Sequence, residues 1–189
     1  YINLENGYSS PQPTPTWDAF QRHQQAVNNG LSFYMRRRRA ADYASVKQQL
    51  AALAGCPADE LAITRNTTES LGTVIHGIDL EPGAEAVMCD QDYGTMLEQF
   101  RQQSRRRGLR CVEIQVPLHP RDDQEIVDTY ARAMTPRTKL LLLSHMINIT
   151  GQVLPVRKIA DMAHARGVAV IVDAAHSFAQ LVFTVPELD

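Results

Sequence analysis

The stretch AVIVDAAHSF, residues 169–178, places one carboxylate at the end of an apolar run. Ala169 to Val172 are small or branched apolar residues, as in a buried strand, and Asp173 and His176 follow them. An unpaired buried ion costs several kcal/mol, so we expect Asp173 to have a partner. That partner is a set of backbone N–H groups, a magnesium ion or a protonated heterocyclic ring.

Strand-like and helix-like segments alternate upstream of this stretch. Short apolar runs alternate with segments of helical periodicity, several of which end in Gly or Pro. This alternation predicts an α/β fold with a mostly parallel sheet. The predicted strands are 61–64, 84–89, 110–116, 139–145 and 168–173, and the predicted helices between them are 68–78, 94–108, 124–134 and 156–167.

Length, charge and cysteine content narrow the class of protein. The chain has 189 residues, 44% of them apolar and 21% charged, which suits one globular domain. A net charge of -2 gives no electrostatic case for a nucleic-acid partner or a membrane surface. No apolar run approaches the roughly 20 residues of a membrane span. Three well-separated cysteines predict free thiols and a cytoplasmic location, and the absent initiator Met suggests a processed or truncated chain, from which an export signal could have been removed.

The first part of the chain predicts an arm followed by helices. Residues 1–15 contain three prolines with Asn, Gly and Ser, which favours an extended arm, and a helix is expected from about Thr16. The segment 40–55 has helical periodicity and ends at Gly55. Four apolar side chains at helical spacing are expected to face a core: Tyr43, Val46, Leu50 and Leu53.

Ligands of open parallel sheets bind at the carboxyl ends of the strands, so polar residues there are candidate site residues. They are 66–68, 90–93, 144–148 and 173–177. His145 has two interpretations, a side chain facing a ligand or a hydrogen-bonded structural histidine. Thr67 and Thr68 follow Asn66 at a helix start, where N–H groups and hydroxyls could bind a phosphate. An ordinary N-cap explains the same residues, and the local sequence alone favours the cap.

Nucleotide-binding motifs do not accompany these positions. The chain has no G-x-x-x-x-G-K-[ST] loop and no G-x-G-x-x-G, which argues against ATP, GTP and dinucleotides. Magnesium usually comes with nucleotide phosphates and a second acidic group, so it is a weaker partner for Asp173. A protonated ring nitrogen stays a good candidate, because charge-assisted pairing stabilises both ions.

Several motifs in fixed order resemble one enzyme family. The segments TRNTTES, DYGTM and SHMINITGQVLP, followed by VIVDAAHS, resemble the class V aminotransferases, which are pyridoxal-phosphate enzymes of fold type I. The ordered set N-T-T-E, H-x-x-N-x-x-G-x-x-x-P and V-D-x-A-H carries the resemblance. It implies a sheet with helices on both faces, a pyridoxal 5'-phosphate cofactor, a small amino-acid-like substrate and a homodimer.

The resemblance also implies roles for six residues. Asp173 matches the Asp that pairs with the pyridine nitrogen of the cofactor and keeps it protonated. Thr67 and Thr68 match positions that bind the phosphate, which favours phosphate binding over a plain cap. Asn148 and His176 match positions near the phenolic oxygen of the ring. Tyr93 falls in the segment that supplies the ring-stacking side chain.

Departures from the family pattern bear on the reaction. His176 where desulfurases have Gln, and DYGTM where they have a His-rich stretch, favour isopenicillin N epimerase-like proteins over cysteine desulfurases. None of the three lysines, Lys47, Lys139 and Lys158, matches the Schiff-base motif, and the chain ends 16 residues after Asp173. We therefore expect residues 16–189 to be the front part of the large domain, with the Schiff-base region and the small C-terminal domain absent.

Two hypotheses follow for the function. In the first, the full-length protein catalyses transamination or epimerisation at Cα of an amino acid or small peptide, with cysteine desulfurase or lyase chemistry as the alternative. In the second, the chain is a non-catalytic binding or assembly module of the same fold. The coding sequence beyond Asp189 distinguishes the two hypotheses.

Overall fold

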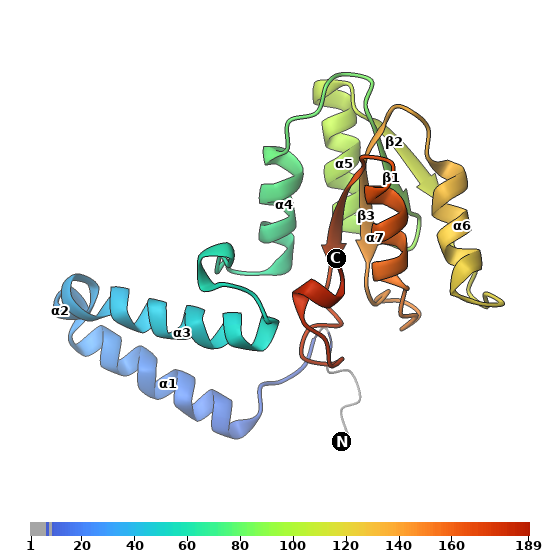
Figure 1. Cartoon of the computed structure of the whole chain (residues 1–189). Coiled ribbons are helices and arrows are strands. Elements are labelled where there is room, and N and C mark those ends of the chain that lie inside the picture. Colours follow the sequence, from blue (N-terminus) through green and yellow to red (C-terminus); the bar gives the residue numbers. More distant parts are fainter. Residues whose placement is uncertain (1–6, 8) are drawn as a thin grey trace. The chain divides into compact units, whose positions relative to one another are not determined.

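The computed structural model describes residue 7 and residues 9–189, which fall into two compact units, 1–62 and 63–189 (Figure 1). Part of the arm predicted at 1–15, namely residues 1–6 and 8, lies outside the described residues. The first unit is helical. Its elements are α1 (Thr14–Asn29), α2 (Leu31–Phe33), a π-helical turn (Tyr34–Arg38), α3 (Arg39–Ala54) and a 3-10 turn (Ala58–Glu60).

The ends of these helices follow from local sequence. Helix α1 has Pro15 in its first turn, where a missing N–H loses no helical hydrogen bond. It begins at Thr14, two residues before the predicted start. Helix α3 ends at Gly55, whose φ of 70° suits glycine, and the Gly55 N–H bonds the Ala51 carbonyl.

The prediction that the apolar stripe of α3 faces a core is wrong for three of its four residues. Tyr43, Val46 and Leu53 are 43%, 50% and 57% exposed and Leu50 is half-buried, whereas Ala51 and Ala54 are buried. Helical spacing places side chains on one face but does not say whether another element covers that face. Among the described residues, no helix has both the length and the apolar character of a membrane span.

The second unit is a parallel sheet between two pairs of helices, which confirms the predicted fold class. The strand order is β2-β1-β3-β4, and all pairs are parallel. All seven residues of β3 except Lys139 are buried, as expected of a central strand with an apolar side chain on each face. The elements in chain order are α4 (Thr67–Gly77), β1 (Glu85–Cys89), α5 (Gly94–Arg107), β2 (Arg110–Ile114), α6 (Asp123–Ala133), β3 (Thr138–Ser144), α7 (Val156–His164), β4 (Ala169–Asp173) and a 3-10 turn (Val185–Glu187).

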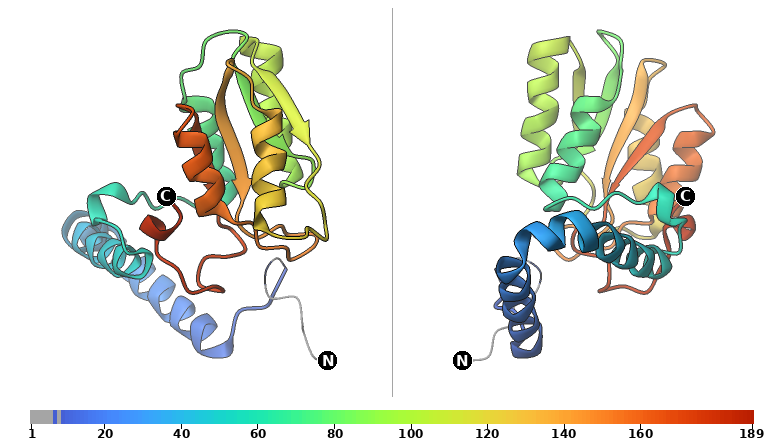
Figure 2. Two further views of the ribbon diagram at one scale, coloured as in Figure 1. Left: turned by 45° about the vertical axis from the view of Figure 1, so that its right-hand side comes forward. Right: turned by 90° about the vertical axis from the view of Figure 1, so that its left-hand side faces the viewer.

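Each face of the sheet has its own hydrophobic core, and helices cover both faces (Figure 2). Helices α4 and α5 cover one face, where Ile75 and Phe100 pack against Met88 and Leu142. Helices α6 and α7 cover the other face, where side chains including Ile126, Tyr130 and Ile159 pack against Val87 and Leu143. Alternate residues of β1 and β3 therefore serve opposite cores, the two-faced arrangement expected of this fold.

The strand predicted at 61–64 is wrong. These four residues form no strand, and they lead from the 3-10 turn to α4. The Thr64 hydroxyl donates to the carbonyl of Asn66 (3.2 Å), the N-cap residue of α4. The last residue of this segment therefore bonds to the start of the helix. A four-residue apolar run does not indicate whether a neighbouring strand is present to pair with it. The run alone therefore could not distinguish a strand from a connecting segment.

The cysteines have the burial that their strand positions predict. Cys89 in β1 is fully buried, and Cys111 in β2 is partly buried against the α4 and α5 side of the sheet. All three cysteines are free, and burial raises the pKa of the Cys89 thiol to about 11. Cys89 is therefore a protonated core side chain.

Candidate functional site

The segments that carry the residues predicted for the site lie at the carboxyl edge of the sheet (Figure 1). The neighbouring strands β1, β3 and β4 end at Cys89, Ser144 and Asp173. Helices α4 and α5 begin at the same edge, because each runs antiparallel to the strand that follows it. The residues after these strands and the start of α4 therefore form one candidate site.

Asp173 is the last residue of β4 and is buried, with 8% of its surface exposed. Its Oδ1 accepts a hydrogen bond from the Ala175 N–H (3.0 Å). Its backbone carbonyl accepts from the His145 N–H (2.9 Å) and so ties β4 to the residue after β3. Within residues 9–189 no Lys, Arg or His nitrogen lies within 4.0 Å of its carboxylate. One backbone donor is thus its only partner in the described part of the chain, and the carboxylate can pair with a cationic ligand.

Asn66 caps the start of α4, and the side chains of the two threonines that follow take no part in this cap. The Asn66 side chain accepts from the Glu69 N–H (2.9 Å), and the Glu69 carboxylate accepts from the Arg65 N–H (2.9 Å). Thr67 and Thr68 are the first two residues of the helix and are exposed. Over the described ranges neither hydroxyl has a hydrogen-bond partner. The cap and an anion site are therefore compatible, because different residues form them.

Tyr93 is the N-cap residue of α5 and is half-buried. Its ring packs against the core under α4 and α5, while its backbone carbonyl accepts from the Met96 N–H (2.7 Å). The backbone bond and the packing hold the aromatic side chain at the end of β1, one strand away from β3. The stacking role that the sequence motif implies for Tyr93 stays a prediction.

Asn148 and His176 lie in the turns after β3 and β4. Asn148 is exposed in a turn closed by hydrogen bonds from Ile147 N to Gln152 O (2.9 Å) and from Gly151 N to Ile147 O (2.8 Å). His176 is half-buried in the turn after Asp173. The structure thus brings the loops of all six predicted residues to one edge, and Asp173 is the most buried of the six.

His145 follows β3 directly and is 7% exposed. Its Nδ1 is buried and has no hydrogen-bond partner in the described residues, which argues against the hydrogen-bonded structural interpretation. Its ring meets the Phe183 ring edge-on, with centroids 4.8 Å apart. Burial lowers the pKa of His145, so the ring is neutral near pH 7.

A second buried carboxylate, Asp92, belongs to this edge and had no assigned role in the sequence analysis. Its Oδ2 accepts from the Cys89 N–H (2.7 Å), and its Oδ1 accepts from the Ser144 N–H (3.2 Å) and from the Ser144 hydroxyl (2.6 Å). Burial raises the pKa of Asp92 to about 6, and the nearby Asp173 carboxylate adds to this rise. The available signal was an acidic residue directly before Tyr93, but its partner Ser144 lies 52 residues away.

The three lysines are placed as follows. Lys47 belongs to α3, Lys139 is exposed near the start of β3, and the Lys158 ammonium pairs with the Asp123 carboxylate (2.7 Å). None is joined to a site residue by a recorded contact in the described part of the chain. The expectation that none of them is the Schiff-base lysine stays a prediction.

Comparisons with known proteins agree with the sequence motifs. A family model described as Aminotransferase class-V matches residues 2–189. Isopenicillin N epimerase from Streptomyces clavuligerus is 31% identical over 179 residues, which cover 93% of this chain and 44% of that protein. A probable cysteine desulfurase from Halobacterium salinarum is 29% identical over 197 residues, which cover 100% of this chain and 46% of that protein. The chain spans about half the length of the curated relatives it matches.

A solved structure shares the fold. It is the complex between the cystine C-S lyase C-DES and its reaction product cysteine persulfide. The match has a TM-score of 0.84 at 24% identity and covers 94% of this chain and 48% of that chain. The parallel sheet and its covering helices therefore also occur in a protein of low sequence identity.

Proposed function

The chain belongs to the aminotransferase class-V family, and from this premise we propose that the full-length protein is a pyridoxal-phosphate enzyme acting at Cα of an amino acid or small peptide. The resemblance inferred from the N-T-T-E, H-x-x-N and V-D-x-A-H motifs is thereby confirmed at the level of the family. One observation carries the proposed activity: Asp173 is a buried carboxylate without a cationic partner in the described residues. A protonated pyridine nitrogen is the partner that this environment lacks.

The other residues of the edge fit the remaining parts of the cofactor. The free hydroxyls of Thr67 and Thr68 and the first N–H groups of α4 suit a phosphate. In this proposal Tyr93 stacks on the ring, and Asn148 and His176 approach its phenolic oxygen. The neutral ring of His145 adds no positive charge that would compete for Asp173. Hydrogen-bond donors and an aromatic side chain stand beside a carboxylate that has no cationic partner in the described residues. Together they complement a cofactor that carries an anionic phosphate ester and a cationic ring.

The residues of this chain would hold and polarise the cofactor. Bound pyridoxal phosphate withdraws electrons from the substrate's Cα, so that a bond at Cα breaks more easily. Asp173 keeps a proton on the ring nitrogen, since the buried carboxylate stabilises the charged form. Thr67 and Thr68 would bind the phosphate, and Tyr93 would pack against the ring. Together these residues would hold the cofactor in one orientation relative to the substrate.

We place the reaction with epimerisation or transamination, and keep carbon–sulfur chemistry as the alternative. The epimerase from Streptomyces clavuligerus supports the first, together with His176 and the DYGTM segment. The desulfurase relatives and the C-S lyase support the second. Cα–hydrogen exchange in deuterated water distinguishes the first route, and sulfide release from cysteine distinguishes the second.

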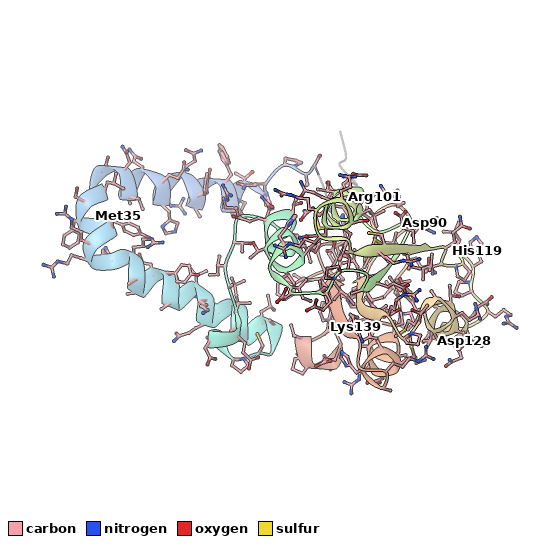
Figure 3. All side chains as sticks on the ribbon, turned by 90° about the horizontal axis from the view of Figure 1, so that it is seen from above. Met35, Asp90, Arg101, His119, Asp128 and Lys139 are labelled. Carbon is pink, nitrogen blue, oxygen red and sulfur yellow. The ribbon has the colours of Figure 1, made fainter. Side chains whose placement is uncertain are left out.

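The wider organisation is proposed on the same basis. Residues 16–189 are the front part of a pyridoxal-phosphate-binding domain, and the free thiols support a cytoplasmic location. Exposed apolar side chains on the helical unit support a homodimer: Trp17, Phe20, Leu31, Phe33 and Met35. Met35 is labelled in Figure 3.

Absorbance of the full-length protein tests the proposed activity. We expect a band near the edge of the visible region after incubation with pyridoxal phosphate. Asp173→Ala should weaken or shift the band, because the ring nitrogen loses its counter-ion. Asp128→Ala is the matched control, since Asp128 is an exposed carboxylate on α6 (Figure 3). A full-length protein that stays colourless with the cofactor would overturn the proposal.

A further inference from the structure

Asp92 joins the ends of two neighbouring strands through three hydrogen bonds, which we call the Asp92 clamp. Its Oδ2 accepts from Cys89 N, the last residue of β1, and the Asp92 N–H returns a bond to the Cys89 carbonyl (3.0 Å). Its Oδ1 accepts from both the backbone N–H and the hydroxyl of Ser144, the last residue of β3. Asp92 is 4% exposed and Ser144 is 5% exposed, so water has little access to either.

The clamp supplies hydrogen bonds beyond the point where the backbone pairing of β1 with β3 ends. The pairing of β1 with β3 extends from Glu85 to Val87 on β1 and to Leu141 on β3. Ser144 therefore lies beyond the part of β3 that pairs with β1. A buried N–H without an acceptor is destabilising, and the Asp92 carboxylate supplies that acceptor. The side chain therefore sets the separation of β1 and β3 at their carboxyl ends.

Two proposed site residues are attached directly to the clamp. Asp92 precedes Tyr93 in the chain, and Ser144 is the register partner of Asp173 on β4. A change in the separation of Asp92 and Ser144 thus changes the separation of the stacking side chain from the carboxylate that meets the ring nitrogen.

We propose that Asp92 is a positioning residue for the cofactor: it holds Tyr93 and Asp173 at the separation that the pyridine ring requires. This inference rests on the proposed function of the site. Asp92 acts through Tyr93 and Ser144, and all three of its recorded side-chain hydrogen bonds are to the chain itself. Its role is distinct from that of Asp173, whose carboxylate has one recorded donor.

The geometry requires a carboxylate at this position. All three hydrogen bonds are accepted by Asp92, from two backbone N–H groups and one hydroxyl. Asparagine has one acceptor oxygen and one NH2 group, so in either orientation its NH2 faces a backbone N–H. Asp92→Asn therefore breaks one side of the clamp while it preserves side-chain volume.

The test compares Asp92→Asn with Asp128→Asn in the full-length protein. Asp128 is an exposed carboxylate on α6, so its variant removes an equal charge outside the clamp and outside the candidate site (Figure 3). Three quantities are measured: the Kd of the apo protein for pyridoxal phosphate, the induced circular dichroism of the bound cofactor, and the split between kcat and KM. Induced circular dichroism reports the orientation of the ring, which a loss of stability alone does not change.

We expect Asp92→Asn to raise the Kd by about tenfold or more and to change the induced circular dichroism, because small misplacements at a site have large effects. Ser144→Ala should produce a smaller change of the same kind, since the Ser144 backbone N–H remains. The double variant should resemble Asp92→Asn, because residues of one hydrogen-bond network are not additive. Asp128→Asn should match the wild type.

The outcomes separate this inference from the proposed function. A wild type that binds no pyridoxal phosphate contradicts the proposed function. A wild type that binds it, together with an Asp92→Asn variant of unchanged Kd and unchanged dichroism, overturns the positioning role. If Asp92→Asn does not fold, Ser144→Ala carries the test, and normal dichroism in that variant overturns the inference.

Discussion

The two edges of the sheet treat their buried carboxylates differently. At the amino edge, Glu85 begins β1 and is 2% exposed. Its carboxylate accepts from the Thr135 hydroxyl (2.5 Å) and pairs with the Arg137 guanidinium (2.8 Å), and Arg110 lies 3.8 Å away. These partners hold the pKa of Glu85 below its ordinary value. The chain itself therefore supplies both the hydrogen bonds and the positive charge.

At the carboxyl edge, Asp92 and Asp173 have hydrogen bonds but no cation from the described residues. Asp92 has three donors, and Asp173 has one. A fully partnered carboxylate is explained by structure, whereas Asp173 retains capacity for a partner from outside the chain. The arginines thus supply positive charge at the amino edge, whereas at the carboxyl edge Asp173 has no cationic partner among the described residues.

The largest expected effect is the pH dependence that Asp92 gives to the unfolding free energy. Burial raises the pKa of Asp92 from 3.8 to about 6, so the folded protein binds this proton more tightly than the unfolded chain does. The resulting stabilisation is fully present below about pH 4 and is lost as pH rises through about 6. We expect the unfolding free energy of the wild type, relative to Asp92→Asn, to fall by about 3 kcal/mol between acid and neutral pH.

Urea unfolding of the apo protein at several pH values measures this difference. Asp128→Asn, at an exposed residue of α6, is the control for the loss of one carboxylate. Parallel curves for Asp92→Asn and the wild type would show that Asp92 titrates alike in the folded and unfolded states.

The amino edge provides the next effect. Glu85→Gln keeps an acceptor for Thr135 but removes the charge that pairs with Arg137 and Arg110. We expect the melting temperature of the apo protein to fall by several degrees, and cofactor binding to stay unchanged because this edge is opposite the site. Thermal unfolding measures the first and a pyridoxal-phosphate titration the second. Glu81→Gln, at an exposed residue near the same edge, should leave both unchanged.

The sequence predicted these strands and helices, because burial on both faces of a central strand leaves a continuous apolar run such as 140–143. It also predicted which residues follow the strand ends. It misassigned 61–64 as a strand and the apolar stripe of α3 as facing a core, because neither pattern indicates whether a neighbouring strand or helix is present. The pairing of Asp92 with Ser144 depends on two loops that are distant in sequence, so no local pattern indicates it.

The smallest effect on the stability of the apo protein is expected from a substitution of Asp173. The contrast with Glu85→Gln tests most directly whether the two edges of the sheet differ. Asp173→Asn preserves the acceptor for the Ala175 N–H and breaks no ion pair within residues 9–189. The unfolding free energy of the apo protein should therefore change by less than about 0.5 kcal/mol.

The difference should appear only when pyridoxal phosphate is added. A ligand at 100 times its Kd stabilises a protein by about 2.7 kcal/mol, and a variant that binds about 100-fold more weakly gains only about 0.4 kcal/mol at the same concentration. Asp173→Asn should thus lose most of the cofactor-induced rise in melting temperature, whereas Glu85→Gln should retain it. An apo Asp173→Asn protein as destabilised as Glu85→Gln would mean that Asp173 is already a structural residue, because a carboxylate waiting for a ligand contributes to stability only when that ligand is bound.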